Sequence, residues 1–347
     1  MKCINNENTK NIDSRNRRKR QIRRQITVII SAVILLTILM FLLFFVLNSK
    51  KAVYYISDFE SENYKTSIVD KDLISLDLCV AADDVKLADY TGNDSFHGQA
   101  LFDVADGKVI YSNNMYDKLY PASTTKILTA YVTLKYGNLD DIVTVSETAV
   151  DLPFDAQVCS LQAGDSIKLY DLLCGLMLYS GNDAANAIGE HISGSVEAFV
   201  DLMNEEALKL GATHTHFVNP HGLHDENHYT TVYDLYLMFN ACIKYDEFNE
   251  IYSNSYWTCD VTGSDGSVRS LTWEPTNWFS NGASNITSDY SNKGGKTGTT
   301  DEAGSCLVLS SVYLNDKQCI SIIMGADNKD ELYSEMNNML DAGKAEL

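Results

Sequence analysis

The sequence predicts an α+β fold, in which an antiparallel sheet flanked by helices is assembled from both ends of one domain around a helical insert. Two observations predict it. Strand patterns lie in two groups, at residues 99–114 and 292–326, whereas residues 165–245 carry apolar side chains at helical spacing. Helices gathered in a block, rather than alternating with single strands, are typical of α+β domains.

The first strands lie in "QALFDVADGKVIYSNN", residues 99–114, where Asp106-Gly107 interrupts the strand pattern. Asp-Gly between two strand-like runs is a strong signal for a β-hairpin with a two-residue turn. We therefore expect the sheet to begin with this hairpin.

The segment "KLYPASTTKILTAYVTLKYG", residues 118–137, predicts the first helix. Pro121 keeps the residue before it extended, so the helix begins near Ser123, and Gly137 ends it. Ser123 and Lys126 then lie one turn apart on one face, at the helix end that favours negative charge. The pair alone has two readings: a catalytic serine and its base, or a helix cap followed by a solvated lysine.

The helical block continues in "DSIKLYDLLCGLMLYS", breaks at "SGND" and resumes in "AANAIGEHI". A third helix, "SVEAFVDLMNEEALKLGA", is stopped by Gly211, and a fourth, "TTVYDLYLMFNACIKY", has Thr231 and Asp234 placed for a capping box. Strands then return in "NKGGKTGTT", "SCLVLSSVYL" and "KQCISIIMGA", with a turn at Asn315-Asp316. A last helix is expected from about Asp330 to Leu340.

Charge divides the chain of 347 residues, whose formal net charge is −20. Residues 1–25 hold nine Lys or Arg and two acidic residues, and the following Ile26–Leu47 holds none. Twenty-two helical residues span about 33 Å, enough for a bilayer core of about 30 Å. We expect a transmembrane anchor; a cleavable signal peptide is the alternative, but no clear small-x-small cleavage site follows. The basic cluster at residues 15–24 predicts a cytoplasmic N-terminus, a single-pass protein of the cell membrane and an extracytoplasmic remainder.

Eight cysteines show no framework spacing, and Cys3 falls in the cytoplasmic tail. Cys174, Cys306 and Cys319 lie in apolar runs, so we expect them to be small core residues rather than bridges. The acidic composition of the external part argues against nucleic acid as a partner.

Three short motifs each occur once: Ser123-Thr-Thr-Lys126, Ser180-Gly-Asn182 and Lys296-Thr-Gly298. They fall at a helix start, a loop between helices and a strand. Ser-x-x-Lys, Ser-Asp-Asn and Lys-Thr-Gly together are the signature of penicillin-binding proteins and class A β-lactamases.

Over residues 96–340 the chain resembles the serine-type D-alanyl-D-alanine carboxypeptidases, the low-molecular-weight penicillin-binding proteins of the peptidase S11 family. The resemblance rests on "YPASTTKILTA", "LMLYSGNDAANAIGEH", "FVNPHGLHDENHYTT" and "GGKTGTTDEAGSCLV". The middle motif is Ser-Gly-Asn, as in that family. The resemblance implies a penicillin-binding protein/β-lactamase-like transpeptidase fold with an all-helical subdomain, and no metal or cofactor.

This gives four expected parts: a basic tail (1–25), the anchor (26–47), a spacer (48–94) and a catalytic domain (95–347). Only 49 residues follow Gly298, so we expect the second β-rich domain and the C-terminal amphipathic anchor of many relatives to be missing. Ile26–Leu47 would replace that anchor.

The chemistry of acyl transfer explains the residue types. A serine hydroxyl needs a base, and Lys126 can serve Ser123 only if it is neutral, which burial and the nearby charge of Lys296 favour. Ser180 is placed to protonate the leaving amine, and Asn182 to hold Lys126 and the substrate's amide carbonyl.

The third motif is expected to bind substrate. Lys296, Thr297, Gly298 and Thr299 lie on an edge strand, where an extended peptide with a terminal carboxylate can add. The resemblance implies that the N–H groups of Ser123 and Thr299 bind the oxyanion. It also implies the substrate, peptidoglycan stem peptides ending in D-Ala-D-Ala, and inhibition by β-lactams.

Several alternatives stay open. D,D-endopeptidase action on cross-links and a non-hydrolytic β-lactam receptor would use the same motifs. A class A β-lactamase is disfavoured because its Glu-x-x-Leu-Asn pattern is absent from the sequence. A zinc peptidase is suggested by the histidines of residues 214–228, but they form no His-Glu-x-x-His helix.

Overall fold

The computed structural model describes residues 35–37, 40, 78–88, 90–287 and 289–346. The chain divides into two compact units, Met1–Leu73 and Ile74–Leu347. In the first unit only residues 35–37 and 40 are described, and they are helical. The expected anchor Ile26–Leu47 therefore lies almost wholly outside the described residues, as does the basic tail. Among the residues that are described, none belongs to a helix long and apolar enough to cross a bilayer.

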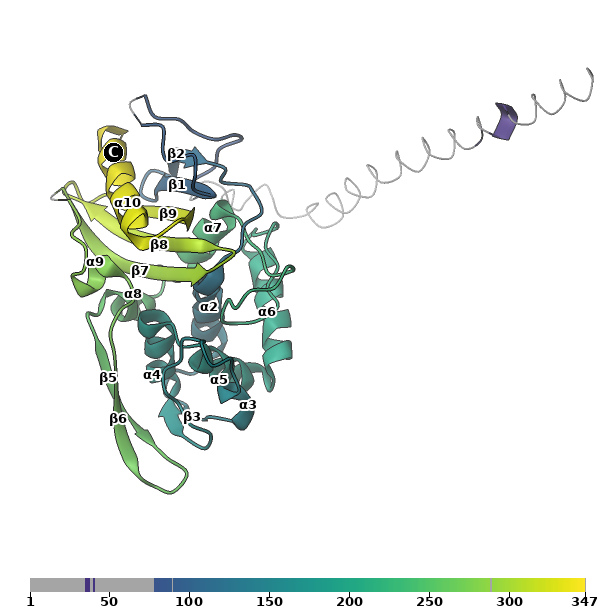
Figure 1. Ribbon diagram of the computed structural model, residues 1–347, viewed down its shortest axis with the longest axis vertical. Coiled ribbons are helices and arrows are strands. Elements are labelled where there is room, and N and C mark those ends of the chain that lie inside the picture. The colour runs from purple at the N-terminus through teal and green to yellow at the C-terminus, as the bar shows by residue number, and fades with distance from the viewer. Residues whose placement is uncertain (1–34, 38–39, 41–77, 89, 288, 347) are drawn as a thin grey trace, which may run out of the picture. The chain divides into compact units, whose positions relative to one another are not determined.

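The second unit has the predicted α+β fold (Figure 1). Its main sheet is antiparallel, with the order β2-β1-β9-β8-β7. Both ends of the unit contribute strands, as expected: β1 (Gly98–Asp103), β2 (Lys108–Asn113), β7 (Tyr290–Thr300), β8 (Gly304–Tyr313) and β9 (Gln318–Ala326). Because β1, β8 and β9 are inner strands covered on both faces, they are almost entirely buried.

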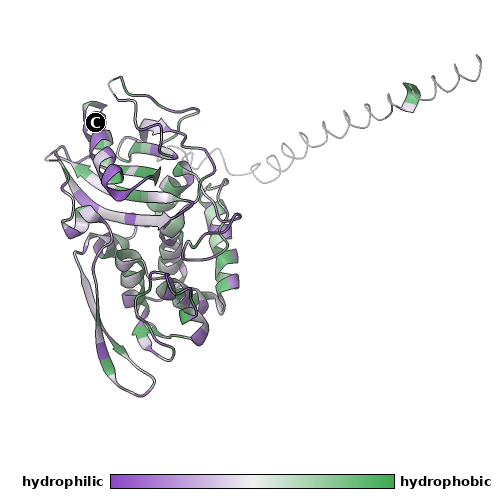
Figure 2. Ribbon diagram, viewed as in Figure 1, coloured by the Kyte–Doolittle hydropathy of each residue, from purple (hydrophilic) through white to green (hydrophobic). Residues whose placement is uncertain are grey.

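Helices cover both faces of this sheet. The C-terminal helix α10 (Lys329–Gly343) packs Leu332, Met336 and Leu340 onto one face. Helices α2 (Lys126–Tyr136) and α7 (Val232–Cys242) belong to the larger core on the other face. Figure 2 shows the edge strand β7 mainly in white and purple, since its sequence YSNKGGKTGTT is polar. Strand β7 is at the edge of the sheet, so one of its sides has no neighbouring strand.

The predicted helical block contains α4 (Leu169–Cys174), the π-helix η3 (Gly175–Tyr179), α5 (Asn182–Ser193) and α6 (Val196–Lys209), and α7 is its last helix. Three short helices outside this block were not predicted: α3 (Glu147–Val150), α8 (Asp246–Ser253) and α9 (Trp278–Asn281). Helix α6 begins after Ser195, whose side chain accepts from Ala198 N, and Gly211 follows its end with φ +86°. The hydroxyl of Thr231 accepts from Asp234 N at 3.0 Å, which confirms the Thr231 half of the predicted capping box. The Asp234 carboxylate accepts from His214 N and the Thr215 hydroxyl.

A second sheet was not predicted. Its order is β3-β4-β5-β6, from β3 (Ile142–Thr144), β4 (Ser166–Lys168), β5 (Trp257–Thr262) and β6 (Val268–Trp273). Two of these strands have three residues, which is too short for an alternating pattern to be recognised. The long β5–β6 hairpin extends away from the rest of the unit in Figure 1.

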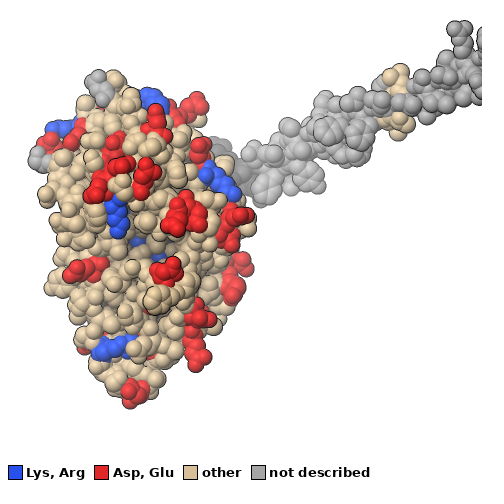
Figure 3. All heavy atoms as spheres, in the orientation of Figure 1, with Lys and Arg blue, Asp and Glu red and all other residues tan. Residues whose placement is uncertain are grey.

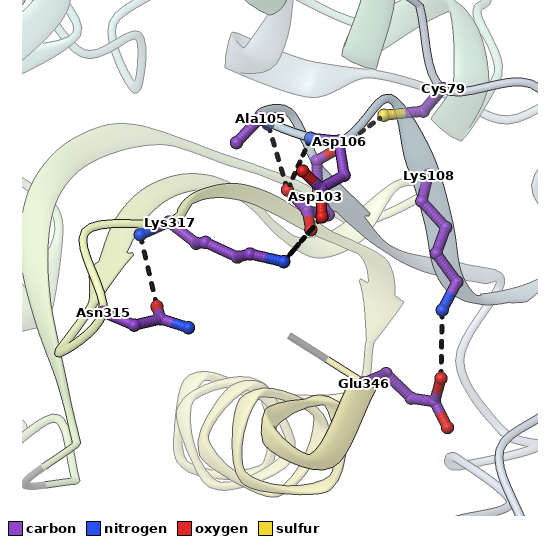
Figure 4. Close-up of polar contacts among 8 residues, drawn as sticks. All are labelled: Cys79, Asp103, Ala105, Asp106, Lys108, Asn315, Lys317 and Glu346. Carbon is purple, nitrogen blue, oxygen red and sulfur yellow. Dashed lines mark hydrogen bonds and ion pairs between the residues drawn. The ribbon is translucent and has the colours of Figure 1, made fainter.

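The predicted hairpin at Asp106-Gly107 exists, but its turn is longer than two residues. Strand β1 ends at Asp103 and β2 begins at Lys108. The Asp103 carboxylate accepts from the N–H groups of Ala105 at 3.0 Å and of Asp106 at 3.1 Å (Figure 4). Lys317 Nζ reaches Asp106 at 2.6 Å and Asp103 at 3.4 Å. The Asp103 side chain thus replaces strand pairing and sets the turn length.

Part of the segment expected as a spacer belongs to the second unit. Cys79 is fully buried, and its N–H donates to the Tyr236 hydroxyl at 2.9 Å. Tyr90 donates to Glu335 at 2.6 Å. Residues from about 78 onward therefore pack on the folded body.

Every cysteine in the described part of the chain is free and buried. This confirms that Cys174, Cys306 and Cys319 are core residues rather than bridges.

Candidate active site

Ser123 lies at the predicted helix start, in a 3-10 turn (Ala122–Thr125) that leads into α2. The residue before it, Ala122, has φ +46°, a left-handed conformation that costs a non-glycine residue about 1–2 kcal/mol. Gly222 and Gly298 lie so close that a Cβ on either would come within 2.9 Å of Ser123 N. The strand β7 and the loop of Gly222 therefore press directly on the peptide bond that leads into Ser123.

Lys126 is fully buried one turn after Ser123, so it is not a solvated charge. Its Nζ lies 3.0 Å from Ser123 Oγ, 2.7 Å from Asn182 Oδ1 and 2.6 Å from the carbonyl oxygen of His221. Burial lowers the pKa of Lys126 well below its usual value, and the positive charge of Lys296 lowers it further.

The three neighbours of the Lys126 Nζ atom determine where its lone pair points when the amine is neutral. A neutral amine has two N–H donors and one lone pair. The oxygens of Asn182 and His221 only accept, so they take the two N–H groups. The hydroxyl of Ser123 is the neighbour that can also donate, so the lone pair faces its proton. This is the geometry of a general base.

Ser180 directly follows η3 and Asn182 begins α5, at the predicted break of the helical block. Ser180 has φ +67°, directly after the π-helix, an element that often marks functional sites. Asn182 N–H donates to the Gln157 carbonyl at 2.8 Å. The Asp183 carboxylate accepts from Cys159 N at 2.7 Å, Ala184 N at 2.9 Å and Leu161 N at 3.1 Å. These bonds fix the loop that presents both side chains.

The third motif lies on the edge strand β7, as predicted. Lys296 is fully buried, and its Nζ lies 2.8 Å from both Ser180 Oγ and the Thr297 carbonyl oxygen. Burial lowers the pKa of Lys296 to about 7. Thr297 is half-buried and Thr299 is exposed, so both hydroxyls are within reach of a ligand at this edge.

The structure thus joins most predicted site residues directly. Hydrogen bonds link Ser123, Lys126 and Asn182, and a further bond links Ser180 to Lys296. Thr297, Gly298 and Thr299 follow on the same strand, with Gly298 against Ser123. Three contributors were missed: the carbonyl of His221, the close approach of Gly222, and Thr276, whose hydroxyl bonds that of Thr297. "PHGL" belongs to a segment on which the resemblance rests, but nothing in the sequence singled out Thr276.

The histidines of residues 214–228 point to different partners. His216 Nδ1 contacts Asn227 O, His224 lies 3.8 Å from Glu302, and His228 contacts Thr125. Within the described ranges, no three His, Cys, Asp or Glu side chains are grouped to hold a metal ion.

On the face of Figure 3, Asp and Glu side chains are spread over the surface, whereas the two lysines of the site, Lys126 and Lys296, are buried.

This fold and this set of serines and lysines define the class of the penicillin-binding proteins. The crystal structure of the Streptomyces K15 DD-transpeptidase matches with a TM-score of 0.68 and 28% identity, over 74% of this chain and 100% of that chain. A D-alanyl-D-alanine carboxypeptidase from Mycobacterium tuberculosis H37Rv matches with a TM-score of 0.66 and 25% identity, over 76% and 96% of the two chains.

The chain belongs to the peptidase S11 family. The model of that family, described as D-alanyl-D-alanine carboxypeptidase, matches residues 95–328. The D-alanyl-D-alanine carboxypeptidase DacC of Escherichia coli is 36% identical over 70% of this chain and 60% of its own length. DacF of Bacillus subtilis is 33% identical over 68% and 58%. The chain thus spans about three fifths of the length of these curated relatives.

Proposed function

We propose that this chain is a membrane-anchored, serine-type D-Ala-D-Ala carboxypeptidase that trims peptidoglycan stem peptides through an acyl-enzyme on Ser123. One observation carries the proposal: Ser123 Oγ lies 3.0 Å from a fully buried lysine whose other two neighbours can only accept hydrogen bonds. Membership of the peptidase S11 family supplies the substrate class.

In the first step Lys126 takes the proton of Ser123 while Oγ attacks the carbonyl carbon between the two D-alanines. The carbonyl oxygen becomes negative and is bound by the N–H groups of Ser123 and Thr299. Removal of one such donor typically costs about 10²–10³ in rate.

The intermediate then collapses. The C–N bond breaks, and Ser180 passes a proton to the leaving amine of the terminal D-alanine. Lys296 lies 2.8 Å from Ser180, so it can return the proton to that hydroxyl. In the second step water attacks the acyl carbon and gives a proton through Ser180 to Lys296. The bond from that carbon to Ser123 Oγ then breaks, Lys126 returns its proton to Ser123, and the shortened stem peptide leaves.

Recognition follows from the edge strand. The substrate backbone adds to β7, and its terminal carboxylate meets the hydroxyls of Thr297 and Thr299 near the Lys296 amine. A β-lactam presents an amide carbonyl and a carboxylate in a similar arrangement, and would acylate the same serine.

For location, we propose that Ile26–Leu47 spans the membrane with the basic tail in the cytoplasm. The run of uncharged residues and the basic cluster before it support this.

Transfer of the acyl group to an amine instead of water is a second candidate, since the Streptomyces K15 chain, which this chain covers fully, is named a DD-transpeptidase. Endopeptidase action on cross-links uses the same acyl-enzyme.

One experiment tests the proposal. Labelled penicillin should attach to Ser123 at one per chain; Ser123→Ala should abolish the label, and Ser267→Ala, at an exposed serine, should keep it. With a pentapeptide stem, free D-alanine without a cross-linked dimer indicates hydrolysis, and a dimer indicates transfer. Label on Ser123→Ala, or no D-alanine release from any stem substrate, would contradict the proposal.

A further inference from the structure

His228 is buried beside the start of α2, and the proposed reaction assigns it no task. Its ring is 2% exposed and stacks on Phe217, with ring centroids 4.9 Å apart. Nδ1 lies 3.0 Å from Val218 N, and Nε2 lies 2.7 Å from Thr125 Oγ1. Both ring nitrogens therefore have partners, and none of these is a metal ligand.

The partners fix the tautomer. Val218 N–H can only donate, so Nδ1 accepts and carries no proton. In the neutral ring the proton is then on Nε2, which donates to the Thr125 hydroxyl. Burial lowers the pKa of His228 to about 3, so the ring stays neutral near pH 7.

The Thr125 hydroxyl continues this donor-to-acceptor order to the next residue. It accepts from His228, and its own proton points to the carbonyl oxygen of Ala122, 2.8 Å away. Val218 N–H, His228, Thr125 and the Ala122 carbonyl thus form one chain of hydrogen bonds with a single direction.

The end of this chain is the peptide bond between Ala122 and Ser123. A peptide unit is planar and trans, so its C=O and N–H point in opposite directions, and an oxygen held on one side aims the N–H to the other. Ala122 has φ +46°, and such a conformation persists where its surroundings over-determine it. Gly222 packs on the same peptide, since a Cβ there would lie 1.8 Å from the Ala122 oxygen.

We infer that His228, acting through Thr125, is a positioning residue that orients the Ala122–Ser123 peptide and so aims the Ser123 N–H at the oxyanion of the reacting carbonyl. This rests on the proposed function, because it assumes that Ser123 is acylated and that its N–H binds the oxygen.

The test compares two substrates on each variant: an acyl-D-alanyl ester, and the thionoester in which sulfur replaces the carbonyl oxygen. Sulfur is a weak hydrogen-bond acceptor, so the thionoester gains little from an aimed N–H. Thr125→Val and His228→Phe break the chain at different points, so the result does not depend on one variant folding. Thr125→Ser keeps the hydroxyl. Thr124→Val is the matched control, since the buried Thr124 hydroxyl bonds Pro121 O at 2.7 Å instead.

We expect the ratio of ester to thionoester acylation rates to fall by about tenfold in Thr125→Val and His228→Phe. This is less than the loss of about 10²–10³ on removal of an oxyanion donor, because the N–H group is misaligned but still present. It should stay within about twofold in Thr125→Ser and Thr124→Val. Thermal melting identifies the folded variants, and a folded Thr125→Val or His228→Phe with an unchanged ratio would overturn the inference. Failure of the wild type to acylate with either substrate would instead refute the proposed function.

Discussion

The Nζ atom of Lys296 lies 2.8 Å from the Oγ atom of Ser180, although 116 residues separate the two in the chain. This contact joins the edge strand β7 to the loop before α5. It also brings a second buried amine close enough to Lys126 to lower the pKa of that group. The motifs of Asn182 and of Lys296 therefore both act on Lys126 of the first motif.

Lys126→Arg tests the base. Arginine keeps the positive charge but does not lose its proton in proteins. General-base catalysis contributes about 10²–10⁴ in rate, so acylation by a fluorescent penicillin should slow by about that factor. Thermal melting confirms folding. A folded variant that acylates within about threefold of wild type would remove Lys126 from the mechanism.

The lowered pKa of Lys296 predicts that the free energy of unfolding depends on pH. Its pKa is about 7 in the folded protein and about 10.4 when unfolded. Between these values the unfolded chain binds more protons, so the free energy of unfolding rises with pH, and below about pH 7 the contribution is constant. Denaturation of wild type and Lys296→Met should therefore diverge between pH 7 and pH 9 by up to about 2 kcal/mol, in favour of wild type. Parallel curves would show that Lys296 keeps its usual pKa.

Asp183→Asn should destabilise the loop that carries Ser180 and Asn182. The carboxylate accepts three backbone N–H groups, and an amide presents a donor where one of them needs an acceptor. An unsatisfied buried group costs about 1–3 kcal/mol. Denaturant unfolding measures the loss. Asp155→Asn, at an exposed aspartate, is the control and should stay within about 0.5 kcal/mol. Equal effects of the two changes would contradict this account.

A chelator should leave catalysis unchanged. The chemistry proposed for Ser123 and Lys126 uses no metal ion. EDTA treatment followed by dialysis should preserve D-alanine release and penicillin labelling. Activity lost with EDTA and restored by zinc would favour the histidine-rich segment as a metal site.

The anchor can be tested by removing it. A shortened protein that begins near Asp70 keeps Cys79 and the residues packed around it, so it should fold, stay in solution and bind penicillin. The full chain should fractionate with membranes. Full chain recovered in the medium with a new N-terminus after Leu47 would identify the apolar run as a signal peptide.

Much of this architecture could be predicted because local chemistry and tertiary packing agree. Ser195 and Thr231 cap helices whose apolar residues recur at helical spacing, and β8 and β9 are buried runs of strand length. The turn after β1 was predicted too short, because Asp103 folds its side chain back onto the chain, and a pattern of residue types does not reveal that.

The residues that meet at the candidate site could be predicted where the side-chain type itself suggests the chemistry. Ser123, Lys126, Ser180, Asn182 and Lys296 have residue types that suggest their chemistry. The His221 contribution is a backbone carbonyl, which every residue possesses, so no residue type could indicate it. In the sequence His228 is one of five histidines in residues 214–228, and its residue type does not distinguish it from the others. Its contact with Thr125 depends on how the loop of residues 217–229 folds back over the start of α2.

The free cysteines have a consequence for how the protein matures. Those of the described part of the chain are buried as thiols, so this unit needs no oxidant, oxidoreductase or disulfide isomerase to reach its native state. Reducing conditions leave its covalent structure unchanged. The same folded state of this unit is therefore accessible in oxygen-free and in aerated surroundings, and its folding is independent of the redox potential of those surroundings.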